Sequence, residues 1–492
     1  MKGRVNTMKV TLDLISSNDL TISPYIHGTF FENFGTTTYD GIYVGKDSPI
    51  ENINGIRKSV IDGIKEAGIT AIRWPGGCCA DHYHWKWGIG KERKNKMFML
   101  LNKRDKEIWR NDFGTDEFIE LCRLTGAEPV LVINTATGTP EEFRDWFEYC
   151  NGPAETEYGA MRAENGHPEP YNVKIWGIGN TDENVWVADY NNPESYARNY
   201  MRFTTVLRET IDDQDMKVIG LGLSKRHMMP GWVEKCLDVQ TGFGTRRAPD
   251  MLSVHHYIGG AKGTYRECGD GVDYSDEQYY YTLDAVKHYE QDIELHRQYI
   301  AEHGNKRQKT TICFDEWGLW HPEATIEAGQ RQRQTMRDGI FAALTLHLFY
   351  RKCDIVEFAM ETQTCNLLQS LFETKGERFF KTPTFHVFKM FREHLNAIPL
   401  DMEEKDEMTD IFASLSRDGE TITVTVINKD LYEDKDIDLT IPGYAPVSAS
   451  MINSENVRDY NTFDRPDVIT LKEFCGGSIP PHSIVKFIYR SV

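Results

Sequence analysis

The stretch TTICFDE (310–316) is a short, mostly apolar run that ends in two acidic residues. Apolar residues without strict alternation are typical of a strand that is covered on both faces, as in a parallel sheet. Seven further runs share this character: YIHGTFFE (25–32), TAIRWP (70–75), PVLVIN (129–134), VKIWGIGN (173–180), MKVIGLG (216–222), MLSVHHY (251–257) and IVEFAM (355–360). The chain therefore contains eight predicted strands of one kind.

Helical patterns lie between these strands. Thr139 followed by Pro140 is typical of an N-cap with proline at the first helical position, and Glu142 would complete a capping box. Asp116 opens another helix, and long periodic stretches cover 193–212, 275–303 and 325–349. Eight strands that alternate with helices predict a parallel sheet, and the number eight favours closure into a (β/α)8 TIM barrel.

The pattern changes after about residue 395. Segments such as IFASLSRDGETITVTVINKD and SIVKFIYRSV alternate apolar and polar residues around turn signals. This predicts a C-terminal antiparallel β-sandwich, jelly-roll-like in type. MKVTLDL (8–14) alternates in the same way and is expected to pair with it. We therefore divide the chain into an N-terminal strand region (1–24), a barrel (25–394) and a sandwich (395–492).

The composition narrows the class of partner. The 492 residues carry a formal net charge of -19, which disfavours nucleic acid and anionic membranes but is compatible with a neutral sugar. The sequence has no run of 18 apolar residues and no apolar segment after its basic start, so we expect no membrane span and no signal peptide. Ten cysteines without a CxxC pair predict free thiols and a cytoplasmic protein.

Polar side chains follow the predicted strands where the strands end. In a barrel of this type, chemistry takes place at the carboxyl ends of the strands. The residues that arrive there are Glu32, Asn33, the stretch RWPGGCCADHYHW (73–85), Asn180, His255, His256, Tyr257, Asp315, Glu316, Asn366 and Gln369. Aromatic rings can stack on sugars, amides and carboxylates can bind hydroxyls, and two carboxylates can divide glycosidic hydrolysis between an acid and a nucleophile.

Some of these residues have simpler structural explanations. His255 and His256 have no third metal ligand at a typical spacing, so we interpret them as supporting histidines. Cys78 and Cys79 are interpreted as small residues in a glycine-rich turn. We therefore expect neither a metal nor an organic cofactor.

Several motifs occur in an order and spacing that resemble the α-L-arabinofuranosidases of glycoside hydrolase family 51. The resemblance covers nearly the whole chain and is carried by HGTFFENFG (27–35), RWPGGC (73–78) with YHW (83–85), DEWGLW (315–320) and TPTFHVF (382–388). It implies a nucleophile at Glu316. It also implies that five residues contact substrate or the nucleophile: Glu32, Cys78, Asn180, Tyr257 and Gln369. Members of the family often form hexamers.

The segment after Asn180 departs from the family pattern. The family has its acid/base glutamate directly after the asparagine, whereas this chain continues Thr181-Asp182-Glu183. Either two residues are inserted and Glu183 is the acid/base, or Thr181 occupies that position and the protein is impaired, because threonine has no titratable proton near neutral pH. Asp182 is a third, less favoured candidate. We favour Glu183.

The resemblance thus implies a retaining, exo-acting hydrolase that removes terminal α-L-arabinofuranosyl groups from arabinoxylan, arabinan or their oligosaccharides. Two alternatives remain open. The first is a family member acting on β-xylan or β-glucan, and the second is an impaired sugar-binding homologue. A homo-oligomer is expected in each case.

Overall fold

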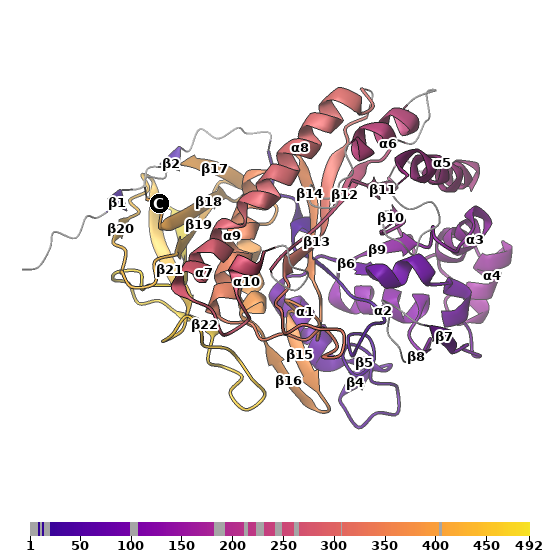
Figure 1. Ribbon diagram of the computed structural model, residues 1–492, viewed down its shortest axis with the longest axis horizontal. Coiled ribbons are helices and arrows are strands. Elements are labelled where there is room, and N and C mark those ends of the chain that lie inside the picture. The colour runs from indigo at the N-terminus through magenta and orange to yellow at the C-terminus, as the bar shows by residue number, and fades with distance from the viewer. Residues whose placement is uncertain are drawn as a thin grey trace, which may run out of the picture.

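The computed structural model describes residues 8–9, 12–13, 20–98, 107–181, 192–210, 215–222, 231–241, 248–259, 265–306, 308–402 and 406–492. A barrel occupies one side of the molecule and an antiparallel sheet built mainly from the C-terminal segment occupies the other (Figure 1).

The eight predicted strands form a closed parallel barrel, so the fold class is confirmed. Around the barrel the order is β10-β11-β12-β13-β14-β3-β6-β9. The strands are β3 (Gly28–Phe30), β6 (Ala71–Trp74), β9 (Glu128–Ile133), β10 (Ile175–Ile178), β11 (Lys217–Leu221), β12 (Met251–Ile258), β13 (Thr311–Leu319) and β14 (Val356–Thr362).

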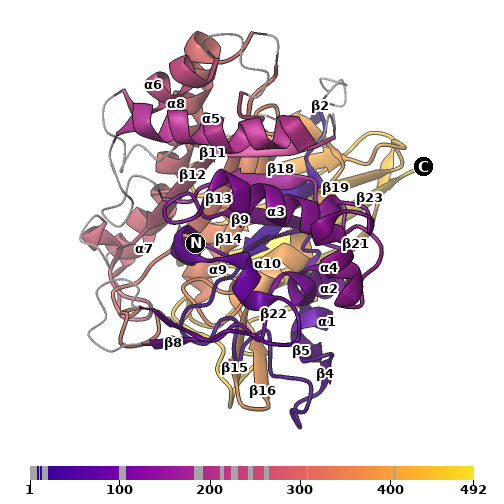
Figure 2. The same ribbon diagram turned by 90° about the vertical axis from the view of Figure 1, so that its right-hand side faces the viewer.

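Ten α-helices are described. They surround the barrel and lie in the segments that connect its strands (Figure 2). They are α1 (Lys58–Ala67), α2 (Thr115–Thr125), α3 (Pro140–Asn151), α4 (Glu157–Glu164), α5 (Pro193–Thr210), α6 (Trp232–Thr241), α7 (Asp276–Asp284), α8 (Lys287–His303), α9 (Met336–Arg351) and α10 (Pro383–Phe391).

Three local predictions need correction. The stretch 275–303 is two helices, because the amides near Ala285 bond to carbonyls three residues back and tighten the chain between α7 and α8. The stretch 325–335 is not helical, and α9 begins only after the capping box of Thr335 and Asp338. At α3, the Thr139 hydroxyl accepts a hydrogen bond from the Glu142 amide, as predicted. The Glu142 carboxylate bonds His84, however, and does not close a capping box.

Apolar side chains from the eight strands pack together inside the barrel. Every strand contributes to one buried cluster: Phe30, Ala71, Val130, Ile175, Ile219, Met251, Cys313, Phe358 and Met360. The barrel interior is therefore packed, and ligands can enter only at its ends. The strands that continue past this cluster carry polar residues at their carboxyl ends.

The C-terminal segment forms a seven-stranded antiparallel sheet. The strands follow the order β2 (Leu12–Asp13), β17 (Ile398–Met402), β18 (Thr409–Leu415), β19 (Thr421–Asn428), β23 (Ser483–Ser491), β21 (Tyr444–Asn453) and β22 (Thr470–Glu473). The N-terminal β2 thus joins this sheet, while β1 (Met8–Lys9) pairs with β20 (Ile437–Asp438). His347 on α9 bonds Thr425 of β19 over 2.7 Å, which fastens the sheet to the barrel.

Short elements complete the loops. They are the strand pairs β4 (Asn52–Ile53) with β5 (Ile56–Arg57), β7 (Lys96–Phe98) with β8 (Glu107–Trp109) and β15 (Phe372–Lys375) with β16 (Arg378–Lys381), and the 3-10 turns η1 (Pro24–Ile26), η2 (Cys78–His82), η3 (Trp85–Gly88), η5 (Arg266–Cys268) and η6 (Arg392–His394). Among the described residues, no helix is both long and apolar enough to cross a bilayer.

Candidate active site

Two consecutive carboxylates, Asp315 and Glu316, both lie within the mouth of the barrel. Successive residues of a regular strand point to opposite faces, so this requires an irregularity. Between Phe314 and Trp317, β13 advances three residues where β14 advances two, and β13 gains the same extra residue against β12. A bulge of this kind re-aims side chains. It lets both acids face the same internal cluster of polar groups.

Three residues from neighbouring strands and loops surround the Glu316 carboxylate. Arg73 Nη2 donates to Oε1 over 2.6 Å, and the Tyr257 hydroxyl donates to Oε2 over 2.7 Å. Burial, and then the charge of Glu316, raise the pKa of Tyr257 well above its usual value, so this phenol stays protonated and remains a donor. A Cβ on Gly77 would lie 2.9 Å from Oε1. The carboxylate is thus oriented through both of its oxygens.

Arg73 is the buried cation of the site, and its side chain is about 1% exposed. Its Nη1 donates to Asn180 Oδ1 over 2.7 Å, and its guanidinium lies 4.4 Å from the centre of the Phe30 ring. Burial lowers the pKa of Arg73, but the charges of Asp315 and Glu316 more than offset this, so the net shift is upward. Arg73 therefore stays charged and links β6 to β10 and β13.

Asp315 and His255 form a second pair next to Glu316, whose Oε1 lies 3.7 Å from His255 Nδ1. The imidazole Nε2 lies 3.3 Å from Asp315 Oδ1, and Ser253 donates to the same oxygen over 2.6 Å. Burial lowers the pKa of His255, and the carboxylates of Glu316 and Asp315 outweigh it and raise that pKa overall. His255 therefore supports the acidic pair. His256 faces away from the site and bonds Asp292 and Tyr265.

Glu32 and Glu316 both lie next to Gly77, close to the position that a Cβ on Gly77 would occupy. A Cβ on Gly77 would lie 3.5 Å from each Glu32 carboxylate oxygen. The Cys79 amide donates to Oε2 over 3.0 Å, and Gln363 Nε2 donates to Oε1 over 2.8 Å. Burial raises the pKa of Glu32, and the nearby charge of Glu316 adds to that shift. Two buried carboxyl groups thus border the space that a side chain on residue 77 would fill, and the half-buried Cys78 follows Gly77 at the start of η2.

Asn180 and Thr181 end β10 beside Arg73. Asn180 Nδ2 is buried and has no hydrogen-bond partner within the described part of the chain. Thr181 donates its hydroxyl proton to Asp81 Oδ2 over 2.5 Å, and both side chains are buried. The other two acid/base candidates, Asp182 and Glu183, lie outside the described residues.

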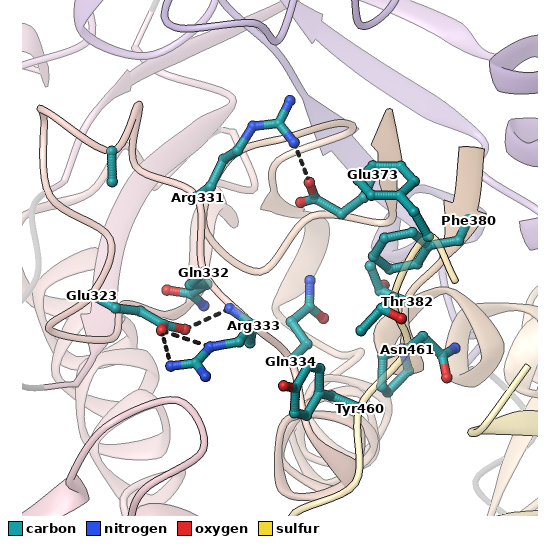
Figure 3. Close-up of a pocket in the computed structure, with 14 residues that line it drawn as sticks. Glu323, Arg331, Gln332, Arg333, Gln334, Glu373, Phe380, Thr382, Tyr460 and Asn461 are labelled. Carbon is teal, nitrogen blue, oxygen red and sulfur yellow. Dashed lines mark hydrogen bonds and ion pairs between the residues drawn. The ribbon is translucent and has the colours of Figure 1, made fainter. Parts of the chain in front are cut away.

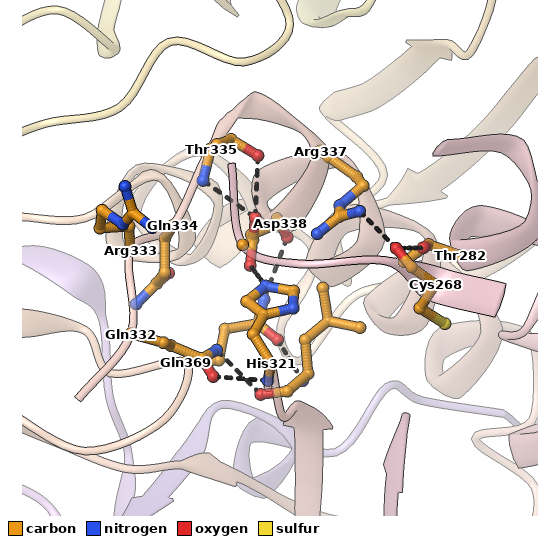
Figure 4. A network of polar contacts seen from close by, with 12 residues as sticks. Cys268, Thr282, His321, Gln332, Arg333, Gln334, Thr335, Arg337, Asp338 and Gln369 are labelled. Atoms are coloured by element: carbon orange, nitrogen blue, oxygen red, sulfur yellow. Dashed lines mark hydrogen bonds and ion pairs between the residues drawn. The ribbon is translucent and has the colours of Figure 1, made fainter. Parts of the chain in front are cut away.

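Gln369 lies behind the strand ends in a buried polar network (Figure 4). Its Oε1 accepts the Leu319 amide over 2.7 Å, and its Nε2 donates to the Asp338 carbonyl and to the Thr384 hydroxyl. Gln332 donates to the Leu319 carbonyl beside it. Both ends of the Gln369 amide are therefore engaged by the protein, and the side chain holds the end of β13.

Sequence reasoning missed two residues of this cluster. Arg73 was quoted within RWPGGC without a role, although an arginine at the end of an apolar strand is costly unless it meets carboxylates there. Gln363, whose amide donates to Glu32, was also missed. Its position directly after β14 was the available signal, because polar residues at strand ends gather in the site.

Two carboxyl groups so close together at the mouth of a TIM barrel fit the chemistry of the glycoside hydrolases, which divide the cleavage of a glycosidic bond between two such groups. Comparison with known proteins gives the family. The chain matches the α-L-arabinofuranosidase 1 domain over residues 64–266 and the α-L-arabinofuranosidase C-terminal domain over residues 315–486. The protein belongs to the α-L-arabinofuranosidases of glycoside hydrolase family 51.

Individual relatives match this chain over almost its full length. An intracellular exo-α-L-arabinofuranosidase of Bacteroides ovatus is 32% identical, over 90% of this chain and 86% of its own. The arabinofuranosidase structure from Xanthomonas axonopodis pv. citri has a TM-score of 0.85 at 25% identity and covers 98% of this chain and 100% of its own. An arabinose complex of the Thermotoga maritima enzyme has a TM-score of 0.83 at 27% identity, with 98% and 99% coverage.

Proposed function

We propose that this α-L-arabinofuranosidase is a retaining, exo-acting enzyme that uses Glu316 as its nucleophile. The observation that carries the proposal is the orientation of the Glu316 carboxylate at the barrel mouth. Arg73 donates to one of its oxygens and Tyr257 donates to the other. A nucleophile gains most from being held in its attacking geometry before substrate arrives.

The proposed reaction has two steps. A Glu316 oxygen forms a bond to the anomeric carbon while the bond to the leaving oxygen breaks, and Glu183 donates the proton that this oxygen requires. Glu183 then accepts a proton from water, whose oxygen attacks the anomeric carbon and releases Glu316. Two inversions at one carbon give net retention.

The furanose would be held by residues around Gly77. Glu32 and Cys78 would bind some of its hydroxyls. Asn180 would donate its unpartnered amide to another hydroxyl, and Gln363, which already contacts Glu32, would complete the set. Gln369 would support this arrangement indirectly through Leu319.

The substrates we propose are terminal arabinofuranosyl groups on arabinoxylan, arabinan or their oligosaccharides. The Bacteroides ovatus relative is an intracellular exo-α-L-arabinofuranosidase, which supports exo action and a cytoplasmic location for this enzyme. We also propose a homo-oligomer, a hexamer as the family resemblance implies, and sedimentation analysis would measure its mass.

The test compares two arabinofuranosides, one with a p-nitrophenyl and one with an alkyl leaving group. A phenolate departs with little protonation, whereas an alkoxide needs a proton donor. We expect the parent to cleave both and Glu183→Ala to lose mainly the alkyl substrate. If the parent fails on the alkyl substrate and Glu183→Ala changes nothing, the acid/base is missing and the impaired alternative replaces this proposal. Preferential cleavage of aryl β-xylosides or β-glucosides would favour the other alternative.

A further inference from the structure

A second cavity lies where the barrel meets the C-terminal sheet (Figure 3). Its volume is about 440 Å³, and its walls come from the segment after β13, the β15–β16 pair, the start of α10 and the loop 460–463 between β21 and β22. We call it the junction pocket. The segments after β13 and β14 follow the carboxyl ends of those strands, so the pocket opens on loops of the catalytic end of the barrel.

Aromatic rings supply much of the pocket wall. Phe380 and Phe463 meet edge to face with their centroids 4.9 Å apart, and Tyr460 contributes a further ring. Arg333 lies 5.8 Å from the centre of the Tyr460 ring. Such rings offer flat apolar surfaces to the C–H faces of a ligand.

The charged residues of the wall are paired with one another. Arg331 donates to Glu373 over 2.7 Å, and the backbone amide and Nε of Arg333 donate to Glu323 over 2.6 and 2.9 Å. Two arginines and two glutamates cancel in formal charge, so a charged ligand gains no net attraction. The side chain of Arg333 is 48% exposed, which leaves donors available to hydroxyl groups.

Hydrogen bonds within the protein hold the wall in place. Gln334 donates to the Ser370 carbonyl and accepts from Thr384, and Asn461 donates to the carbonyls of Lys381 and Ile469. An isolated bridge joins Tyr460 to Thr335. A preformed pocket spares a ligand the entropic cost of ordering its site.

We propose that the junction pocket binds a neutral pentose oligosaccharide, a segment of the polymeric substrate remote from the arabinose being cleaved. The proposal rests on the proposed function for its choice of polymer. A sugar chain matches the pocket because it has apolar C–H faces for the aromatic rings, hydroxyls that can accept from Arg333, and no charge.

The test uses Tyr460→Ala and Tyr460→Leu, which keeps an apolar side chain but removes the ring, with Tyr432→Ala as the control, because Tyr432 is a 74% exposed aromatic residue of the same module outside the pocket. We expect both Tyr460 variants to lower kcat/KM on soluble arabinoxylan or arabinan by about tenfold and to leave p-nitrophenyl arabinofuranoside hydrolysis unchanged. The Tyr432 variant should match the parent on both.

Calorimetry tests the pocket without catalysis. Xylohexaose, which has no arabinofuranosyl group, is titrated into the parent, and α-1,5-arabinohexaose into Glu316→Ala, so that the two arms separate a xylan source from an arabinan source. We expect at least one oligosaccharide to bind, and Tyr460→Leu to weaken that binding by about tenfold.

Two results would overturn the proposal. One is the absence of any Tyr460-dependent binding together with an unchanged ratio of polymer to aryl activity. The other is a smaller sedimenting species for Tyr460→Leu than for the parent, which would make the pocket an interface between copies. A parent that fails to cleave the aryl arabinofuranoside would refute the proposed function, while the xylohexaose titration would still test the pocket.

Discussion

The hydroxyl of Thr181 donates a hydrogen bond to Asp81 Oδ2 over 2.5 Å. Thr181 directly follows Asn180, at the place where the family resemblance implies the acid/base. Its side chain instead ties the end of β10 to η2, and its hydroxyl has no titratable proton near neutral pH. Thr181 therefore does not supply the proton for the leaving group, and our proposal assigns that proton to Glu183.

Thr181→Val removes this bond while it preserves the shape of the side chain. Leaving a buried carboxylate oxygen without its hydrogen-bond donor costs about 1–3 kcal/mol, so we expect the free energy of unfolding, measured in urea, to fall by that amount. Activity on the alkyl arabinofuranoside should persist, and Thr181→Ser should restore stability. A selective loss of the alkyl substrate in Thr181→Val would instead place Thr181 in the proton-transfer step.

Gly77→Ala tests whether the space beside the two carboxyl groups must stay open. The new Cβ would lie 2.9 Å from Glu316 Oε1 and 3.5 Å from both Glu32 oxygens, so it would displace Glu316, the proposed nucleophile, and crowd both acids. We expect kcat/KM on the aryl arabinofuranoside to fall at least about tenfold, because misplacement by about 1 Å is already costly to a reaction. Thermal unfolding should change little. Full activity would mean that substrate does not enter between Glu32 and Glu316.

Tyr257→Phe removes one of the two donors that orient Glu316. A hydrogen bond to a charged group contributes about 1.5–3 kcal/mol, so we expect kcat/KM to fall roughly 10- to 150-fold if the bond is fully used in the transition state. Tyr265→Phe is the matched control, because its hydroxyl bonds His256 on the outer side of β12. Equal activities of the two variants would contradict an orienting role for Tyr257.

The architecture was predictable because each barrel strand is a continuous apolar run. The positions of Glu316, Tyr257, Asn180 and Glu32 at strand ends followed from the same pattern. The bulge in β13 could not be predicted, since an extra residue leaves no trace in an apolar run. Nor could the sequence distinguish Gln363 from Gln369, because both follow β14 and only the path of the chain decides which amide reaches Glu32.

Glu361 makes the stability of the enzyme depend on pH. This side chain on β14 is fully buried, and neither carboxylate oxygen has a hydrogen-bond partner among the described residues. Burial raises its pKa well above the usual value. The folded state therefore holds a proton that the unfolded chain releases above about pH 4.5, so stability is highest below that pH and falls as pH rises toward the raised pKa.

Glu361→Gln should remove this dependence, because an amide of the same shape does not titrate. Urea unfolding of parent and variant at intervals from pH 5 to pH 8 should give a stability difference that grows in favour of the variant by up to about 1.4 kcal/mol per pH unit. The exposed Glu164 on α4 supplies the control, and Glu164→Gln should follow the parent. A difference between Glu361→Gln and the parent that stays constant with pH would show that Glu361 is ionised in the folded protein, with a counter-charge that compensates its burial.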